Sequence, residues 1–463
     1  MDSRVQRFFE NIRGKKIALI GIARTNLPLC ELFAKKGAYV TACDRKSREQ
    51  LGETADFLEQ NGVTLKLGEH YMDDIDADII FRSPGIYYND AKLTGYRKKG
   101  VVVTSEMEVF FRICPCRTYA VTGSDGKTTS TTVIAKLLEH SGKKVFLGGN
   151  IGLAILPFIE EMTADDYAVV ELSSFQLISM RESPDVAVIT NVSPNHLDVH
   201  GTMDEYVQSK LNILLHQSAF SRTVLNLDNE ITAGMRDLVR GRLCCFSRKQ
   251  KVDSGAYCDA NGDIYRVMDG KTEFVMNRSD IKLPGDHHVE NYLDAISAVY
   301  DEVSVDDIVQ VAKTFGGVEH RTEFVRELHG VKYYNDSIAT SPTRVIAGLK
   351  AFGTRCIIIA GGYDKHIPME PLGPFINQYV KTLILTGDTS EKIEAAVKND
   401  PSYNPQNIEI VRADDMAQAV QIAAEKARPG DIVALEPASA GFDRYKDFEE
   451  RGRHFKTLVE SLQ

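Results

Sequence analysis

The stretch AVTGSDGKTTSTTVIAKLLEH, residues 120–140, contains a glycine-rich turn followed by Lys-Thr. The common phosphate loop has the spacing G-x-x-x-x-G-K-[ST]. Its backbone N–H groups hold phosphates, its lysine reaches the terminal phosphates and its hydroxyl binds magnesium. Val121 stands where that spacing requires the first glycine, so this chain has a shorter loop. We predict a nucleotide-phosphate site formed by Gly123, Ser124, Asp125, Gly126, Lys127, Thr128 and Thr129.

The residues around this loop predict the elements that position it. Residues 117–123 have the pattern of a strand, and Val133, Ile134 and Leu137 share one face of a helix that Gly142 ends. In a strand–loop–helix unit, the loop N–H groups and the positive end of the helix dipole both face a bound anion. The alternative is a glycine turn without a ligand, but Gly-Lys-Thr in this context favours the phosphate site.

Acidic and histidine side chains follow the next two predicted strands. Glu171 ends the first of them, and His196, Asp198 and His200 follow the second. An H-x-D-x-H pattern can bind a transition metal, but no cysteine or further histidine completes such a set. A carboxylate with a single histidine beside a nucleotide fits magnesium better.

The helix after this segment carries a lysine in an unusual position. Thr202 and Glu205 have the spacing of a capping box, which predicts the start of the helix. Apolar residues from Tyr206 to Leu215 then form one broad face, with Lys210 near its middle. The lysine stem can lie on apolar surface with its charge in water, or the amine can be buried with a lowered pKa. A neutral amine could be chemically modified or bind a phosphate, and the residues leave these alternatives open.

The N-terminal segment alternates predicted strands and helices, at residues 15–21, 26–37 and 38–44. This order predicts a parallel sheet. Asp44 has nearly the spacing of a ribose-binding acid in a dinucleotide fold, but Ala23 and Asn26 stand where the fingerprint needs glycine. A nicotinamide dinucleotide site is therefore disfavoured. We expect a Rossmann-like fold that binds another ligand at the carboxyl edge of its strands.

From Val318 onward, strands and helices alternate again, which predicts a further α/β sheet. Turn residues and charges follow its strands, notably Asp336, Lys365 and residues 439–441. The strands of this part are predicted within residues 330–342, 355–365, 380–387, 407–413 and 431–445.

The composition is that of a globular protein of about three domains, with 463 residues, 43% hydrophobic and 26% charged. The net charge is −10, whereas a nucleic-acid binder usually has a basic surplus. We find no signal peptide, no run near the ~18 apolar residues of a membrane span, and no C-x-x-C pair among the eight cysteines. We therefore expect a cytoplasmic, free-thiol protein that binds no nucleic acid and does not insert into a membrane. We also expect a monomer.

Several short motifs occur in order along the chain: TGxxGKTT in the loop, GGNIG (148–152), ELSSFQL (171–177), NHLDVHG (195–201), EHR (319–321) and NDSxAT (335–340). This set resembles the Mur ligase superfamily over essentially the whole chain. GGNIG and ELSSFQL make it more similar to the D-glutamate-adding branch than to the folylpolyglutamate synthases, which share the ATP-binding domain.

The resemblance implies an α/β protein of three domains. Residues 1–106 would form a Rossmann-like domain that binds the UDP substrate. Residues 107–317 would form the central ATP-binding domain, with a phosphate loop and a mostly parallel sheet. Residues 318–463 would form a C-terminal Rossmann-like domain that binds the incoming amino acid.

The resemblance also implies the reaction, a ligation in peptidoglycan precursor synthesis. ATP phosphorylates the carboxylate of UDP-N-acetylmuramoyl-L-alanine. The amine of D-glutamate attacks the acyl phosphate, and a tetrahedral intermediate collapses to amide, ADP and phosphate. Phosphoryl transfer depends mainly on alignment and charge neutralisation, which a phosphate loop and magnesium supply.

By resemblance, Lys127, Asn150, His196 and Lys210 are catalytic. Two magnesium ions are implied, with Thr128, Glu171, His196 and Lys210 as ligands, and Lys210 matches a family lysine that carries a carbamate. That match would explain an amine on an apolar face, because carbamylation requires the neutral amine and makes it an anion. ATP contacts outside the loop match Asn291, Arg321 and Asp336.

The substrate contacts of the family fall in the first and third domains. Those of the UDP substrate match Arg24, Thr25, Arg45, Lys46, Ser83, Pro84, Gly85, Asn150 and Ser173. Those of the amino acid match Thr340, Lys365, Gly441, Phe442 and Phe448. A cation such as Lys365 suits a dicarboxylic amino acid.

Three residues depart from the family pattern. Ile338 stands where NDSKAT has lysine, Gly441 where a serine contacts the amino acid, and Glu436 where a small polar residue is usual. These departures leave L-glutamate or another amino acid as an alternative. Two other classes also remain: a nucleotide-dependent oxidoreductase, against which the missing glycines argue, and a catalytically silent relative that acts as a binding protein, against which the retained Lys127 and Lys210 argue.

Overall fold

A computed structural model describes residues 2–23, 25–152 and 154–463 of the chain. These residues form two compact units. The first contains the chain up to Asp280 together with His287–Ala312, and the second contains Ile281–Asp286 together with Lys313–Gln463. Arg24, a predicted UDP contact, lies outside the described residues.

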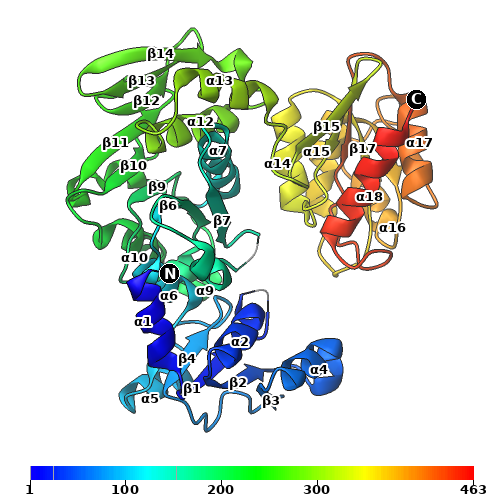
Figure 1. Cartoon of the computed structure of the whole chain (residues 1–463). Coiled ribbons are helices and arrows are strands. Elements are labelled where there is room, and N and C mark those ends of the chain that lie inside the picture. Colours follow the sequence, from blue (N-terminus) through cyan, green and yellow to red (C-terminus); the bar gives the residue numbers. More distant parts are fainter. Residues whose placement is uncertain (1, 24, 153) are drawn as a thin grey trace. The chain divides into compact units, whose positions relative to one another are not determined.

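The N-terminal part of the first unit is a sheet of five parallel strands in the order β3-β2-β1-β4-β5 (Figure 1). The strands are β1 (Lys16–Ile20), β2 (Tyr39–Asp44), β3 (Thr64–Leu67), β4 (Ile79–Arg82) and β5 (Val102–Thr104). The helices are α1 (Ser3–Ile12), α2 (Asn26–Lys35), α3 (Arg48–Leu51), α4 (Glu53–Gln60), α5 (Ala91–Lys98) and α6 (Glu106–Ile113). The strand order reverses between β1 and β4, and sheets of this kind bind ligands at the carboxyl edge of such a reversal. The predicted Rossmann-like sheet is confirmed.

The second sheet of this unit has nine strands in the order β14-β13-β12-β11-β10-β9-β6-β8-β7. They are β6 (Arg117–Thr122), β7 (Val145–Gly149), β8 (Tyr167–Glu171), β9 (Val186–Ile189), β10 (Arg222–Asn226), β11 (Arg242–Ser247), β12 (Gly255–Cys258), β13 (Asp263–Met268) and β14 (Lys271–Asn277). Along this order, each pair of neighbouring strands between β7 and β12 is parallel. β13 is antiparallel to both β12 and β14. The prediction of a mostly parallel sheet that carries a phosphate loop is confirmed.

Helices connect the strands of this second sheet and follow its last strand (Figure 1). They are α7 (Lys127–His140), α8 (Ser174–Leu177), α9 (Leu197–His200), α10 (Met203–Leu215), α11 (Glu230–Ala233), α12 (Asp286–Ala298) and α13 (Val305–Thr314), with short 3-10 turns at Leu156–Glu161, Arg236–Leu238 and Arg278–Asp280. α7 directly follows β6, so it begins at the carboxyl edge of the central strands.

One hydrophobic cluster continues from the first sheet into the second, and includes Phe81 of β4 and Leu172 after β8. Buried Arg82 crosses the same boundary. Its Nη2 donates to Ser179 Oγ at 2.8 Å and to the Phe175 carbonyl at 2.9 Å. The two sheets of the first unit therefore share a packed core with a hydrogen-bonded arginine at its margin.

The second unit is a sheet of six strands in the order β15-β16-β20-β17-β18-β19, in which only β15 is antiparallel to its neighbour. Its strands are β15 (Glu323–Leu328), β16 (Val331–Asn335), β17 (Cys356–Ala360), β18 (Val380–Leu385), β19 (Glu409–Arg412) and β20 (Ile432–Leu435). Its helices are α14 (Pro342–Phe352), α15 (Gly373–Tyr379), α16 (Ser390–Lys398), α17 (Met416–Lys426) and α18 (Phe448–Ser461), with a 3-10 turn at Glu370–Leu372. This sheet is the second Rossmann-like one that the sequence predicted.

Two general expectations can be compared with the structure. The eight cysteines are all buried free thiols, as expected. No helix in the described ranges is both long enough and apolar enough to cross a membrane.

Candidate active site

The predicted phosphate loop connects β6 to α7, and glycine is required at two of its positions. Gly126 caps α7 with φ +79°, in the left-handed region that favours glycine. A Cβ on Gly126 would lie 2.6 Å from Asn291 Oδ1, and one on Gly123 would lie 1.9 Å from Thr190 Oγ1. The loop backbone therefore packs directly against these side chains. Since neither glycine has a side chain, none from these two positions covers the start of α7.

The residues after β9 hold the loop in shape. Thr190 Oγ1 donates to the Asp125 carbonyl at 2.6 Å, and the Asp125 N–H donates to Asn191 Oδ1 at 3.0 Å. The Ser124 N–H donates to the Asn191 carbonyl at 2.8 Å. Sequence reasoning did not single out Thr190 or Asn191. The available signal was their position directly after a fully buried strand, at the edge where the loop also lies.

Two lysines meet at one carbonyl of the loop. Lys127 Nζ donates to the carbonyls of Gly123 at 3.1 Å and Ser124 at 2.9 Å. Lys210 Nζ, from α10, donates to the same Gly123 carbonyl at 2.7 Å and to Thr122 Oγ1 at 3.4 Å. The Lys127 cation and a second amine on one glycine turn, together with the start of a helix, provide an anion-attracting position.

Lys210 is buried, with 1% of its surface exposed, and its Nζ lies 4.6 Å from the centroid of the Tyr206 ring. Burial, and then the charge of Lys127, lower the pKa of Lys210 to about 7, although Asp125 and Glu171 act in the opposite direction. Of the two alternatives left by the sequence, the structure favours the buried amine. A large fraction of this amine is neutral near pH 7.

Glu171 lies at the end of β8 and is almost fully buried. Its Oε2 accepts from Thr128 Oγ1 at 2.7 Å, and its Oε1 accepts from Asn150 Nδ2 at 2.6 Å. The Asn150 N–H also donates to the Glu171 carbonyl at 2.8 Å. The structure thus joins three predicted site residues from the ends of β7 and β8 and from the first turn of α7.

The two histidines that follow β9 occupy different surroundings. His196 is exposed, caps α9 with φ +54°, and its ring lies edge-on to the Phe175 ring at 5.2 Å. His200 is buried, with its Nε2 2.9 Å from Ser174 Oγ and its Nδ1 3.4 Å from Glu205 Oε1. Burial lowers the pKa of His200. His200 therefore belongs to the packing between α8, α9 and α10.

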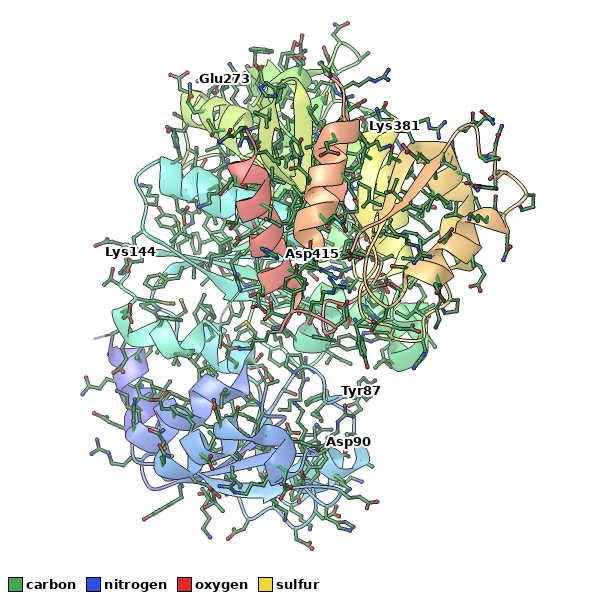
Figure 2. All side chains as sticks on the ribbon, turned by 90° about the vertical axis from the view of Figure 1, so that its right-hand side faces the viewer. Tyr87, Asp90, Lys144, Glu273, Lys381 and Asp415 are labelled. Carbon is green, nitrogen blue, oxygen red and sulfur yellow. The ribbon has the colours of Figure 1, made fainter. Side chains whose placement is uncertain are left out.

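The predicted capping box at the start of α10 is only half formed. Thr202 Oγ1 accepts the Glu205 N–H at 3.1 Å, as predicted. The Glu205 carboxylate, however, accepts from the hydroxyl of Tyr87, which is labelled in Figure 2, and also approaches His200. The prediction of a reciprocal box was wrong because a long-range partner competes for that carboxylate. This contact connects the helix that carries Lys210 to the loop after β4.

A magnesium site can be tested against the residues present. The described ranges contain no cluster of three or more His, Cys, Asp or Glu side chains placed to hold a metal ion. The Thr128 hydroxyl and the Glu171 carboxylate are in contact, and Lys210 lies on the same loop. Oxygen donors of this kind suit magnesium. In the described part of the chain no hydrogen bond links the His196 ring to Thr128, Glu171 or Lys210. Of the predicted ligands in these ranges, His196 is therefore the one that is separate from this group.

The predicted diphosphate loop lies at the carboxyl edge of the first sheet. A Cβ on Gly21, which has φ +86°, would lie 2.5 Å from Ser83 Oγ, so the loops after β1 and β4 touch. The Asp44 carboxylate accepts the backbone N–H groups of Ile22 at 2.7 Å and Lys46 at 3.0 Å. Asp44 therefore holds the loops around this edge and is not presented to a ribose, consistent with the disfavoured dinucleotide site.

The other predicted UDP contacts are distributed over two edges. Thr25 precedes α2, Arg45 and Lys46 are exposed after β2, and Pro84 and Gly85 follow Ser83. Ser173 belongs to the second sheet, where it caps α8 in a capping box with Gln176.

In the second unit, the two predicted nucleotide contacts are neighbours. Asp336 follows β16 and is buried, and Thr322 Oγ1 donates to its carboxylate at 3.4 Å. Burial raises the pKa of Asp336 to about 6, against the opposing effects of the Thr322 hydrogen bonds and the Arg321 charge. Arg321 Nε is buried and has no hydrogen-bond partner among the described residues. This arginine retains an unused donor.

The predicted amino-acid contacts also lie in the second unit. Lys365 Nζ is 5.9 Å from the centroid of the Phe442 ring, which is 60% exposed. Phe448 begins α18, and its carbonyl accepts from Ser337 Oγ at 2.7 Å. Gly441 directly precedes Phe442, and Thr340 precedes α14. The structure pairs Lys365 with Phe442 as an exposed cation and ring.

Two of the departures from the family pattern differ in their surroundings. Ile338 is half-buried, and its N–H donates to the His320 carbonyl at 3.1 Å. Glu436 is completely buried, and neither of its carboxyl oxygens has a hydrogen-bond partner in the described ranges. Burial, and then the charge of Asp336, raise the pKa of Glu436 well above its ordinary value. Burial therefore favours the neutral form of Glu436.

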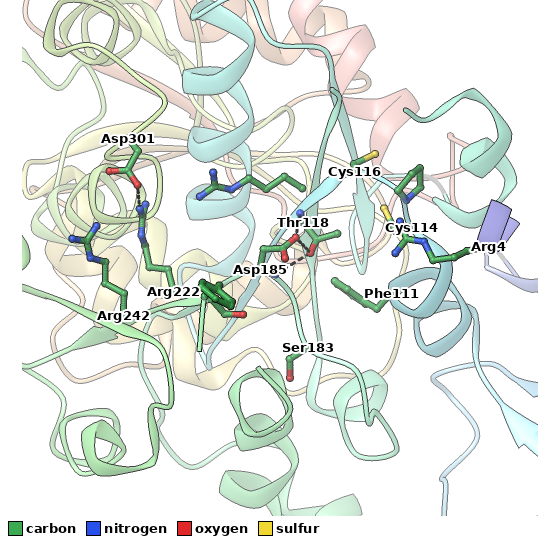
Figure 3. Close-up of a pocket in the computed structure, with 14 residues that line it drawn as sticks. Arg4, Phe111, Cys114, Cys116, Thr118, Ser183, Asp185, Arg222, Arg242 and Asp301 are labelled. Atoms are coloured by element: carbon green, nitrogen blue, oxygen red, sulfur yellow. Dashed lines mark hydrogen bonds and ion pairs between the residues drawn. The ribbon is translucent and has the colours of Figure 1, made fainter. Parts of the chain in front are cut away.

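A cavity of about 670 Å³ lies at the amino edge of the second sheet (Figure 3). Its lining includes Arg117, Arg222 and Arg242, the first residues of β6, β10 and β11. Thr118, which also lines the cavity, donates through its N–H and hydroxyl to Asp185 at 2.8 and 2.9 Å. None of the predicted site residues lines this cavity. The predicted chemistry lies at the opposite ends of the same strands.

The phosphate loop, the paired lysines and the buried acid on a parallel sheet define a nucleotide-using α/β enzyme. Two family models match the chain: "Mur ligase middle domain" over residues 121–299 and "Mur ligase, glutamate ligase domain" over residues 320–439. Proteins named UDP-N-acetylmuramoylalanine–D-glutamate ligase are similar along their whole length. That of Acetivibrio thermocellus is 47% identical and that of Clostridium novyi 46%, each covering 100% of both chains.

Solved structures show the same fold. The UDP-N-acetylmuramate–alanine ligase of Thermotoga maritima matches with a TM-score of 0.57 at 17% identity, covering 96% of this chain and 99% of its own. A pseudomurein peptide ligase of Methanothermus fervidus matches with a TM-score of 0.54 at 18% identity, covering 97% of this chain and 100% of its own. The chain belongs to the Mur ligase family, the ATP-dependent ligases that form amide bonds, and to its D-glutamate ligase branch.

Proposed function

We propose that this chain joins D-glutamate to UDP-N-acetylmuramoyl-L-alanine with ATP, in the cytoplasm, as a step of peptidoglycan precursor synthesis. The observation that supports this most directly is the convergence of Lys127 and the buried Lys210 on the Gly123 carbonyl, next to the Thr128–Glu171 pair. This geometry suits phosphoryl transfer. The substrates are those named for the relatives that are 46–47% identical over the whole chain.

The first chemical step is activation of the muramoyl carboxylate. A carboxylate is a poor electrophile. Its oxygen attacks the terminal phosphorus of ATP, the bond from that phosphorus to the bridging oxygen breaks, ADP leaves, and the acyl phosphate that forms has a good leaving group. Lys127 and the N–H groups at the start of α7 would hold the transferring phosphoryl group and neutralise its charge. Magnesium, held by Thr128 and Glu171, would supply further charge neutralisation between the phosphates.

The second step is attack by the amine of glutamate. The C–N bond forms at the acyl carbon, the tetrahedral intermediate loses phosphate, and the amine proton leaves to solvent or phosphate. We assign Lys365 to the side-chain carboxylate of glutamate, because a lysine cation recognises such a group. Phe442 lies beside this cation, and Thr340, Gly441 and Phe448 complete the proposed amino-acid site.

Lys210 would act as a carbamate. The neutral amine attacks CO₂, a C–N bond forms as one C=O π bond opens, and one proton is released, so the neutral amine becomes an anion. The low pKa of about 7 in the unmodified chain makes the required neutral form abundant. As an anion, Lys210 would add an oxygen ligand for a second magnesium ion beside Glu171. His196 would enter this set only with a rearrangement of the exposed segment that it caps.

We assign the three sheets to three tasks. Residues 1–106 would bind the UDP part of the substrate at the Ser83–Gly85 loop, residues 107–317 would bind ATP, and residues 318–463 would bind the amino acid. Asn291, Arg321 and Asp336 would contact the nucleotide.

Formation of ADP tests this proposal against its alternatives. The purified protein is mixed with ATP, magnesium and UDP-N-acetylmuramoyl-L-alanine, with and without D-glutamate, and ADP is measured. We expect continuous ADP formation, beyond one equivalent per enzyme, only with the complete mixture, and none with Lys127→Met. ADP formation without the UDP substrate would contradict the proposed acceptor. No ADP with any amino acid would favour a silent binding protein.

A further inference from the structure

Three buried side chains form a hydrogen-bonded row beside the phosphate loop. Ser130 lies in the first turns of α7, and Asn291 and Asp294 lie one turn apart on α12. Ser130 Oγ is 2.6 Å from Asp294 Oδ2 and 3.2 Å from Asn291 Oδ1. All three side chains are buried. Asp294 has no role in the function proposed above.

The number of protons in this row determines the direction of its hydrogen bonds. A serine hydroxyl has one hydrogen, and the amide oxygen of asparagine can only accept. Ser130 must therefore donate to Asn291 Oδ1 if that contact exists. Its contact with Asp294 can then form only if Asp294 carries a proton and donates to Ser130 Oγ.

The surroundings of Asp294 favour this protonated form independently. Its side chain is buried in the interior of the first unit, and burial together with the nearby charge of Glu290 raises its pKa well above the ordinary value. Its other oxygen, Oδ1, is buried and has no hydrogen-bond partner among the described residues. An unpartnered carbonyl oxygen is tolerated much better than an unpartnered carboxylate oxygen.

The row fixes the orientation of the Asn291 amide. Its Oδ1 is held by Ser130 and lies so close to Gly126 that a Cβ there would be only 2.6 Å away. Its Nδ2 is buried and has no hydrogen-bond partner in the described ranges. Because an unpaired buried donor is costly, this N–H₂ group, on the amide whose oxygen faces the loop glycine, is a prepared donor for a ligand.

We propose that Asp294 is a positioning residue for the nucleotide: as a neutral acid it donates to Ser130, Ser130 donates to Asn291, and Asn291 presents its N–H₂ group to an acceptor atom of the nucleotide. This inference rests on the proposed function only in taking the ligand at the loop to be ATP or ADP.

The opposite hydrogen-bond direction makes a different prediction. An ionised Asp294 would accept from Ser130, Ser130 would accept from Asn291 Nδ2, and Asn291 would present its oxygen to the ligand. Asp294→Asn keeps a donor at this position and removes the charge. The new amide can donate to Ser130 as the neutral acid does, so it preserves our direction, and the protonation state of Asp294 itself separates the two cases.

The test is binding of Mg·ADP, measured by calorimetry without turnover. We expect Asp294→Asn to bind within about twofold of the unaltered protein. We expect Asp294→Ala and Ser130→Ala each to bind about tenfold more weakly, the loss of roughly one hydrogen bond. The matched control is Ser297→Ala on the same helix, where a buried hydroxyl donates to the Leu293 carbonyl at 2.7 Å; its affinity should be unchanged.

Kinetic constants distinguish a positioning role of Asp294 from a merely structural one, because a structural defect would not change the KM for ATP selectively. The KM for ATP should rise in Asp294→Ala and Ser130→Ala, while the KM for the amino acid stays constant. Equal weakening in Asp294→Asn and Asp294→Ala, or unaltered binding in Asp294→Ala, would overturn the inference. Absence of ADP binding to the unaltered protein would instead overturn the proposed function, and this inference with it.

An infrared measurement covers the case in which Asp294→Ala does not fold. The carbonyl stretch of a protonated carboxylic acid is distinct from the bands of carboxylates. The spectrum of the unaltered protein minus that of Asp294→Asn at pH 8 should contain a protonated-acid band. A carboxylate band in that difference would show an ionised Asp294 and refute the inference.

Discussion

The buried amine of Lys210 gives a prediction whose magnitude can be worked out. Burial and the charge of Lys127 lower the pKa of Lys210 to about 7 in the unmodified chain. At pH 7.5, an amine with this pKa is about 75% neutral, whereas one with the ordinary pKa of 10.5 is about 0.1% neutral. The form that reacts with CO₂ is therefore enriched roughly 750-fold at Lys210. We predict that Lys210 is the preferred site of carbamylation in this chain.

The assay is carbon NMR with ¹³C-labelled bicarbonate. The unaltered protein should show one carbamate resonance that is absent from Lys210→Met. The matched control is Lys136→Met, which removes an exposed lysine from α7 that pairs with Glu139 at 2.8 Å; the resonance should persist there. Loss of the carbamate should also abolish ligation in Lys210→Ala, and bicarbonate or a short carboxylate should partly restore it.

The pH dependence of carbamate formation separates a lowered pKa from an ordinary one. At fixed dissolved CO₂, the rate should rise only about twofold between pH 7 and 8.5, because a group with a pKa near 7 is already mostly neutral there. A lysine with an ordinary pKa would show a rise of about 30-fold over the same range. A 30-fold rise, or a carbamate resonance that survives in Lys210→Met, would refute the reasoning. Near-normal turnover by Lys210→Ala would refute the carbamate's role.

Four further predictions concern single residues. The folded-state pKa of Lys210 lies below its unfolded value, so the unfolded chain binds more protons between pH 7 and 10.5 and the stability contribution of this lysine rises with pH. Without bicarbonate, Lys210→Met should therefore have a higher free energy of unfolding than the unaltered protein, by on the order of 4 kcal/mol at pH 7.5, and urea unfolding should show this difference shrinking toward pH 10.5. Gly126→Ala, which is strained at φ +79°, should weaken Mg·ADP binding by about tenfold in calorimetry. Thr128→Val removes the hydroxyl that contacts Glu171 and should raise the magnesium concentration for half-maximal rate by about tenfold. Lys365→Ala should raise the KM for D-glutamate by about tenfold in steady-state assays, with the KM for ATP unchanged.

The strand–loop–helix unit at the centre of the site could be predicted from local sequence. The strand predicted at residues 117–123 is β6, Arg117–Thr122, and the helix predicted to end at Gly142 is α7, Lys127–His140. Both follow from patterns set by local physics, an apolar run bounded by glycine and an apolar face at helical spacing. The place of Lys210 on the apolar face of its helix follows from the same periodicity, whereas the burial of its amine, which the sequence left open, comes from the structure.

The strands between residues 255 and 277 were not predicted from the sequence. The first four residues of β14 are exposed, so no apolar run marks it. A local signal nevertheless exists: Asn261-Gly262 and Asp269-Gly270 separate the three antiparallel strands, and Asp269 and Gly270 have φ of +52° and +75°. Asn-Gly and Asp-Gly pairs favour tight hairpin turns of this kind.

The contacts that shape the site depend on distant partners, which a single sequence does not reveal. Glu205 has the spacing of a capping residue but pairs with Tyr87, which is 118 positions away. Asp294 pairs with Ser130, which is 164 positions away, and no local pattern distinguishes it from an exposed helix acid. Which hydrogen bonds a buried polar group forms is decided only when the elements pack.

The most direct test of the proposed function is the mass of the ligation product. The protein is incubated with ATP, magnesium and UDP-N-acetylmuramoyl-L-alanine, and parallel samples receive D-glutamate, L-glutamate or no amino acid. We predict a product heavier by one glutamate residue only with D-glutamate, which would show that Ile338 and Gly441 are compatible with this substrate. A product only with L-glutamate would contradict the proposed specificity, and no product in any sample would contradict the proposed ligation.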